Sequence, residues 1–255
     1  MRIILLTCLL MLYTTNVLAY NQQDLDKFNA TGICINGDLS GANLSHSNLS
    51  SVNLTGSNLS RANLSNTILN NANLSKTNLT QANIKNSNLT KTKLTDAIAI
   101  KTDFSFSILK ETNFKKANLS YSNFYNVKGY RTRFTGATLN FANLYNSNLQ
   151  ESSFDYIDAE FADFTNANLA QSWFYKAILK DSNFNFSNLY NAKLQFVNFK
   201  NATLDGANIA SGNLRNSDLT SASLQKANLD ETDLRNTKIL GTCFDKTDLD
   251  NISKK

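Results

Sequence analysis

The chain has 255 residues, a formal net charge of +5 and no proline. This length suits one long domain or two ordinary ones, and the absence of proline fits a fold in which few backbone N–H groups lack an acceptor. Three cysteines and one histidine are too few and too scattered for a metal site, so we expect neither a metal nor another cofactor.

Residues 1–19 have the composition of a secretory signal peptide. Arg2 supplies a positive start, an apolar run extends from Ile3 to Leu12, and Val17 and Ala19 stand at the −3 and −1 positions of a cleavage site. The run is shorter than the ~20 residues of a spanning helix, which disfavours the alternative of a membrane anchor. We therefore expect cleavage after Ala19, a secreted or periplasmic protein, and no membrane span in the mature chain.

Residues 20–37 are expected to form an N-terminal cap over the repeats that follow. The stretch 21–30 can form a short helix in which Leu25 and Phe28, three residues apart, face the first repeats. Cys34 is in phase with the repeats and is expected to be buried. Cys243 lies near the opposite end of the repeats, too far away for a disulfide with Cys34.

From residue 38 to residue 249 an apolar residue returns at every fifth position without a slip. There are 43 repeats, of which the first two are centred on Leu39 and Leu44. Their centres are Leu, Ile or Phe except at Ala99, Gly129 and Ala159. Numbered from the centre (position 0), position −2 is nearly always small, position −1 is most often Asn, and positions +1 and +2 vary. A period of five matches neither a strand nor a helix. We expect positions 0 and −2 to face inward.

Repeats such as GANLS, RANLS, QANIK, KANLS, GANIA and KANLD resemble the A(D/N)Lxx signature of the pentapeptide-repeat family, over more than four fifths of the chain. The resemblance implies an all-β fold, a right-handed quadrilateral β-helix in which four repeats make one coil. About 10–11 coils would stack into a rod roughly 50 Å long, with residues 20 apart directly above one another. It also implies that the last coil can serve as a homodimer interface, which is consistent with a C-terminal tail, residues 250–255, too short for a helical cap.

Phenylalanine centres are expected to fill the core of the middle coils from two opposite faces. They are Phe104, Phe114, Phe124, Phe134, Phe154, Phe164, Phe174 and Phe184. The small centres nearby have two interpretations. Either they compensate for the volume of rings on adjacent walls, or they mark a local bulge in which Val127 or Ile157 replaces the missing side chain.

Charged and aromatic residues concentrate in the middle of the repeats. Eleven basic residues stand against three acidic ones between Lys76 and Arg133, and outward-facing aromatic residues occur only between Phe106 and Phe196. We expect aromatic side chains 20 residues apart to stack along the rod in two ladders. Together with two nearby arginines, these ladders form a candidate binding strip for a protein or a glycan. The alternative is that the rings only stack on each other and shield the coil edges. The strip comprises Tyr121, Phe141, Phe161, Tyr125, Tyr145, Arg131 and Arg133.

No catalytic constellation is present, because His46 is isolated and the acidic residues point outward around different faces. We expect no enzyme, but a secreted or periplasmic scaffold that presents faces for protein or glycan binding. The alternative suggested by the resemblance is a DNA mimic that binds a type II topoisomerase, which would need a strongly anionic rod and no signal peptide. Nucleic-acid binding is not expected either, because the basic residues are spread around all faces.

Overall fold

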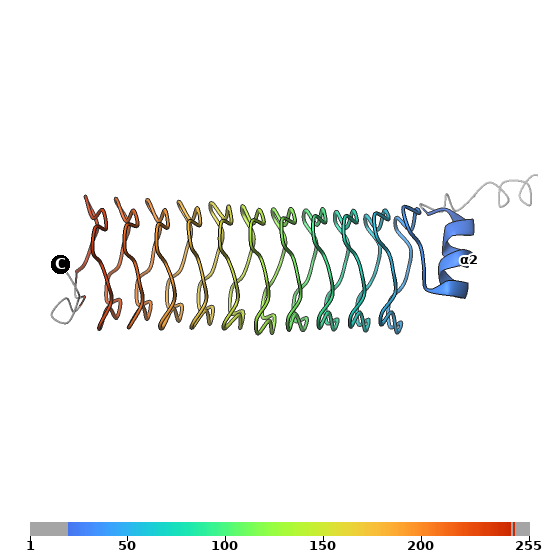
Figure 1. Cartoon of the computed structure of the whole chain (residues 1–255), viewed down its shortest axis with the longest axis horizontal. Helices are drawn as coiled ribbons and strands as arrows, with labels where there is room; N and C mark the ends of the chain where they lie inside the picture. Colours follow the sequence, from blue (N-terminus) through green and yellow to red (C-terminus); the bar gives the residue numbers. More distant parts are fainter. Residues whose placement is uncertain (1–19, 246, 248–255) are drawn as a thin grey trace, which may run out of the picture.

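The chain winds into a straight rod of stacked coils, and one α-helix, α2 (Gln22–Thr31), lies across one end (Figure 1). This computed structural model describes residues 20–245 and 247. The predicted signal peptide, 1–19, and the predicted tail, 250–255, lie outside the described residues. No helix in the described part is both long and apolar enough to cross a membrane.

Each coil contains 20 residues and therefore four repeats. Parallel β-bridges join position −1 of each repeat to position −1 of the repeat 20 residues later, as in Asp38 to Asn58 and Asn58 to Asn78. Positions −2 to 0 form a short side, and positions +1 and +2 form a turn at the corner. In the described part of the chain these single bridges replace longer strands. The expected solenoid-like β-helix is therefore confirmed.

Every backbone N–H of a regular repeat has an acceptor, as the repeat at 62–66 shows. The N–H groups of Ala62, Asn63, Leu64 and Asn66 donate to backbone carbonyls at distances of 3.0, 2.9, 2.7 and 2.9 Å. The remaining one, on Ser65, donates to the side-chain Oδ1 of Asn63 at 3.2 Å. Proline would remove one of these donors at any position, which explains its absence from the sequence.

The prevalent Asn at position −1 also connects successive coils. The Asn63 amide donates to Oδ1 of Asn43 at 3.2 Å, and the Asn83 amide donates to Oδ1 of Asn63 at 3.4 Å. At position −2, a buried hydroxyl often donates to a centre carbonyl of the coil before it, as Thr92 does to Leu69 at 2.6 Å. The repeated polar residues therefore satisfy hydrogen bonds that the coil geometry creates.

Position +2 adopts the left-handed backbone conformation at every corner from Asn36 to Gly241, with φ between 52° and 71°. Thirty-seven of these corner residues are not glycine. None of them is Val, Ile or Thr, although Thr is frequent at the neighbouring position +1. A β-branched side chain is especially unfavourable at positive φ, so the backbone explains this exclusion.

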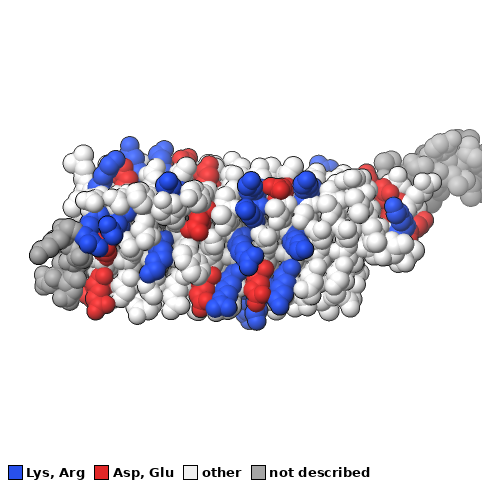
Figure 2. All heavy atoms as spheres, viewed as in Figure 1, with Lys and Arg blue, Asp and Glu red and all other residues white. Residues whose placement is uncertain are grey.

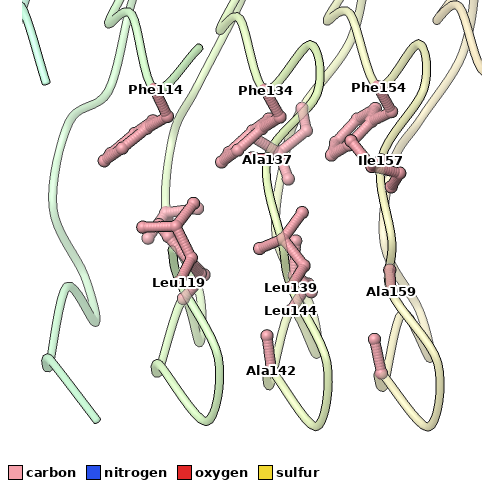
Figure 3. Close-up of a cluster of buried hydrophobic side chains, with 14 of the residues drawn as sticks. Phe114, Leu119, Phe134, Ala137, Leu139, Ala142, Leu144, Phe154, Ile157 and Ala159 are labelled. Carbon is pink, nitrogen blue, oxygen red and sulfur yellow. The ribbon is translucent and has the colours of Figure 1, made fainter. Parts of the chain in front are cut away.

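The phenylalanine centres form two columns of stacked rings that meet edge to face along the axis of the rod. The Phe104 and Phe124 centroids lie 4.9 Å apart with nearly parallel planes, and the Phe114 ring lies at 83° to Phe104. All eight predicted rings are fully buried, as is Leu39, while Leu44 is 5% exposed. Figure 3 shows the column of Phe114, Phe134 and Phe154 beside the smaller residues of the adjacent walls.

The small centres do not mark bulges. At Gly129 the bridges continue in register, and its N–H donates to the Asn148 carbonyl at 2.7 Å. A Cβ at this position would lie 2.5 Å from Cδ2 of Leu149 and 2.7 Å from Oγ1 of Thr132. Leu149 and Thr132 therefore occupy the space at Gly129, in place of the phenyl rings that the volume-compensation interpretation predicted there.

Helix α2 covers the first coil through both polar and apolar contacts. Asn21 caps its N-terminus by accepting from the N–H groups of Gln23 and Asp24. The Asp24 carboxylate in turn accepts from the Asp38 N–H of the first repeat at 2.8 Å. Phe28 is buried, so α2 removes the apolar cross-section of that coil from water. Cys34 is buried beneath it, and both Cys34 and Cys243 are free thiols.

Candidate functional site

The first predicted ladder is a stack of rings at one corner of the rod. Tyr121, Phe141 and Phe161 occupy the left-handed corner position in successive coils, and their centroids are 4.9 Å apart in both pairs. The planes differ by only 3° and 5°. Each ring is about half exposed, yet Phe141 has another ring on both of its faces. A flat ligand therefore has no free face on the middle ring.

The second predicted ladder lies at the next corner along the chain. The Tyr125 and Tyr145 rings stack at 5.9 Å, and Phe106 meets Tyr125 edge to face at 5.2 Å. The Tyr145 hydroxyl accepts from the Asn166 amide at 3.1 Å. These rings also pack on their own neighbours, as the interpretation of a shielded coil edge requires.

The two arginines of the predicted strip are not beside these ladders. Arg131 is ten residues, or half a coil, from both Tyr121 and Phe141. It therefore lies at the diagonally opposite corner of the four-sided coil, and Arg133 lies on the side that follows. The aromatic residues and the arginines of the predicted strip therefore lie on different parts of the rod. Residues that are close in sequence can lie on different sides of a coil.

Arg131 and Arg133 instead line a hollow of about 350 Å³ on their own side of the rod. A second hollow of about 230 Å³ continues it along the rod, and the two share Glu151 and Trp173. We call this surface the Trp173 groove. Its residues are Glu111, Arg131, Arg133, Glu151, Ser153, Trp173 and Lys193.

One wall of the groove is a column in which the usual Asn is missing. Arg133, Ser153, Trp173 and Lys193 occupy position −1 in four successive coils on the same side. It is the longest run of position −1 residues in the described coils that contains neither Asn nor Asp. Arg133, Ser153 and Lys193 do not supply the side-chain acceptor that Asn gives to the N–H at position +1, a hydrogen bond with a net contribution of about 1 kcal/mol. After Trp173 the acceptor comes from another residue, since the Tyr175 N–H donates to Oδ1 of Asp155 at 2.8 Å.

The opposite wall of the groove carries alternating charges at corner positions. Glu111 faces Lys91 at 3.9 Å, and Glu151 accepts from Nε of Arg131 at 2.8 Å. The hydrogen bond from Arg131, with a second from Tyr130, lowers the pKa of Glu151 below its ordinary value. The same carboxylate raises the pKa of Arg131. Glu151 is therefore an anion at neutral pH, and its charge is compensated locally.

Two cations of the groove have no such partner. Among the described residues, neither Arg133 nor Lys193 forms an ion pair, and the Lys193 ammonium donates only to Oδ1 of Asn191, at 3.0 Å. Arg133 is exposed and Lys193 is half-buried. Between them in the column lies Trp173, 43% exposed. Within the described coils no aromatic ring stacks on Trp173, which distinguishes it from the Tyr121 ladder.

The charges of the molecule are concentrated away from α2. Figure 2 shows Lys and Arg side chains over the middle and C-terminal coils of the displayed face, while the coils next to α2 carry few charges. The described residues contain no group of three or more His, Cys, Asp or Glu side chains that could hold a metal.

Of the groove residues, Arg131 and Arg133 were predicted from the sequence, whereas Glu111, Glu151, Trp173 and Lys193 were not. A signal was available, because aligning the sequence in rows of 20 residues puts Arg133, Ser153, Trp173 and Lys193 in one column.

Comparison with known proteins gives one family. The family model for pentapeptide repeats matches in eight copies, over residues 34–66, 57–96, 100–128, 142–181, 182–220 and 213–251. No curated protein matches the chain.

Among solved structures, the chain is similar to HetL, a pentapeptide-repeat protein involved in heterocyst differentiation regulation in the cyanobacterium Nostoc sp. strain PCC 7120. The identity is 24%, the match covers 92% of this chain and 97% of HetL, and the TM-score is 0.48. The chain is also similar to QnrB1, a plasmid-mediated fluoroquinolone resistance protein, at 17% identity over 82% of this chain and 91% of that chain, with a TM-score of 0.44.

Proposed function

Since the chain belongs to the pentapeptide-repeat family, we propose that it is a non-enzymatic, exported scaffold that binds a macromolecular partner along the Trp173 groove. The proposal rests on one observation: on a single side of the rod, four successive coils have a residue other than Asn at position −1. A run of residues that lowers stability and leaves a tryptophan and two cations accessible is expected where a surface has been adapted for binding.

The groove is poorly suited to acid–base catalysis. A general acid or base works best with a pKa near the operating pH, whereas Arg131 lowers the pKa of Glu151. His46 is exposed at a corner of the first coils, far along the chain from the groove. These features support the non-enzymatic part of the proposal. Its export rests on the composition of residues 1–19.

The two tyrosine and phenylalanine ladders have a structural role in this proposal. Their rings contact each other at the coil spacing, so they stabilise two corners of the rod. The right-handed sense of the coils, implied by the family resemblance, belongs to the same proposal. A DNA mimic is not proposed, because the chain has 25 Lys and Arg residues against 20 Asp and Glu residues.

Site-specific crosslinking tests the proposal in the native organism. A photoreactive amino acid replaces Ser153 in the groove or, as a matched control, Ser223, which is also a serine at position −1 but lies on another side. We expect an adduct from position 153 only. It should disappear in the triple variant Arg133→Asn, Trp173→Asn, Lys193→Asn, which should remain folded because each change introduces the usual residue.

Equal adducts from positions 153 and 223, or none from 153, would contradict binding at the groove. Fractionation tests the export separately. The mature protein should be outside the cytoplasm and should begin at Tyr20, and a cytoplasmic protein with an intact N-terminus would refute that part of the proposal.

A further inference from the structure

The direction of the Trp173 groove limits the shape of its ligand. Arg133, Ser153, Trp173 and Lys193 are 20 residues apart, so they follow one another along the axis of the rod. With a coil spacing of about 4.8 Å, Arg133 and Lys193 are separated by roughly 14 Å. A ligand that contacts both must therefore be extended, and it must lie parallel to the rod.

The charges of the groove favour an anionic ligand with separated charges. Arg133 and Lys193 have no carboxylate partner among the described residues, whereas Glu111 and Glu151 each face a cation. The two unpaired cations can each bind a carboxylate of a ligand. A continuous phosphate backbone would instead bring negative charges against Glu111 and Glu151, which disfavours a nucleic acid.

Trp173 and the polar groups around it favour a sugar ring between those charges. The indole is 43% exposed and has no stacking partner in the described coils, so one face can receive a flat ring with C–H groups on its surface. The carboxylates of Glu111 and Glu151 are acceptors and the guanidinium of Arg131 is a donor, as hydroxyl groups require. The coil spacing is also similar to the length of one sugar residue in an extended chain.

We propose that the Trp173 groove binds a linear polysaccharide that contains uronic acids, with carboxylates at Arg133 and Lys193 and one sugar ring on Trp173. This assignment rests on the proposed function, since it names the chemical class of the partner. The distance between Arg133 and Lys193 selects the spacing of the carboxylates on the polysaccharide, and Trp173 binds one of its sugar rings. Because the coils are rigid, these contact residues are already in place before binding.

Calorimetry with defined oligosaccharides tests the assignment on the purified mature chain. The probes are hexasaccharides in which galacturonate, mannuronate or glucuronate residues are separated by neutral sugars, a neutral hexaglucan, a polyglutamate peptide and a thymidylate oligonucleotide. We expect at least one uronate chain to bind in a salt-dependent manner, and roughly tenfold or more tighter than the other three probes.

The variants place the interaction in the groove. Trp173→Asn should weaken uronate binding by roughly tenfold or more, while Arg133→Asn and Lys193→Asn should each weaken it and reduce its dependence on salt. The matched controls are Ile178→Asn and Lys128→Asn, which make the same kinds of change at position −1 on other sides. They should leave the affinity unchanged.

The inference is overturned if no uronate chain binds, if polyglutamate or the oligonucleotide binds as tightly, or if the three groove variants bind like the controls. The experiments distinguish a wrong polysaccharide assignment from a wrong proposal that the groove binds a partner. A crosslinked adduct at position 153 together with no uronate binding would refute the polysaccharide and retain the groove as a binding surface.

Discussion

At the scale of single residues, Gly129 shows how a departure from the repeat can be required by its surroundings. A leucine is the usual centre of a repeat, yet the space at residue 129 is already occupied by Leu149 and Thr132. The bridges on both sides remain in register, so the backbone does not move to make room. The glycine is therefore part of the packing of this wall.

Replacement of Gly129 with the usual leucine should consequently destabilise the protein. We expect Gly129→Leu to lower the free energy of unfolding by about 1–3 kcal/mol, because the added side chain overpacks a filled space. Leu169→Met on the same wall, which nearly conserves volume, is the control and should cost less. Urea denaturation followed by circular dichroism measures both, and a Gly129→Leu protein as stable as the wild type would contradict the packing argument.

At the scale of the repeated element, the left-handed corner is the main constraint on sequence. Every described corner holds position +2 at positive φ, and from Asn36 to Lys226 the N–H of that residue bonds to the next coil, as His46 does to Ser65 at 3.0 Å. The bonds between coils thus hold a conformation that is unfavourable for most side chains. The same geometry accommodates a tyrosine or phenylalanine at the corner, from which the Tyr121 ladder follows.

The adjacent serines at positions 50 and 51 provide a test of the corner. Ser51 has a φ of 61°, whereas Ser50, at position +1, does not have positive φ. Ser51→Thr should lower the free energy of unfolding by roughly 1 kcal/mol, because a β-branched residue is strained there. The same change at Ser50 should have little effect, since threonine is common at position +1. Denaturant titration compares the two variants, and equal stabilities would disprove the explanation.

At the scale of the whole molecule, carboxylates along the rod link its stability to pH. The side-chain hydrogen bonds of Asn201, Thr220 and Arg235 lower the pKa values of Asp181, Asp218 and Asp233, respectively. A carboxyl group with a lower pKa in the folded state binds protons more readily when unfolded. Its stabilising contribution is therefore complete above the ordinary pKa of about 4 and is lost as the pH falls through the folded-state value.

We therefore expect the free energy of unfolding to be nearly constant from pH 7 to about pH 5 and to decrease below about pH 4. Urea titrations between pH 7 and pH 3 measure this dependence. In Asp233→Asn the decrease should be smaller, because one of the titrating groups is gone. A protein that became more stable on acidification would refute the sign of the effect.

The sequence by itself determined the repeat, its phase and the residues that face inward. A strict five-residue period with apolar centres is sufficient to predict which side chains are buried, because each repeat contacts only the repeats next to it. Leu39 and the phenylalanine centres are buried as this period predicts. The ladder at Tyr121, Phe141 and Phe161 also followed from the 20-residue coil that the family resemblance implied.

Only the tertiary structure showed that the corner residues Arg131 and Glu151 line a hollow together with the column that contains Arg133 and Trp173. Arg131 is close in sequence to Tyr125 but lies on another part of the coil, whereas Trp173 is 40 residues from Arg133 and lies in the same column. The same applies to Gly129, because its space is filled by a side chain from the next coil. The physical reason is that neighbours on this rod are set by the closure of each coil after four repeats, so surface proximity follows residues 20 apart rather than adjacent ones.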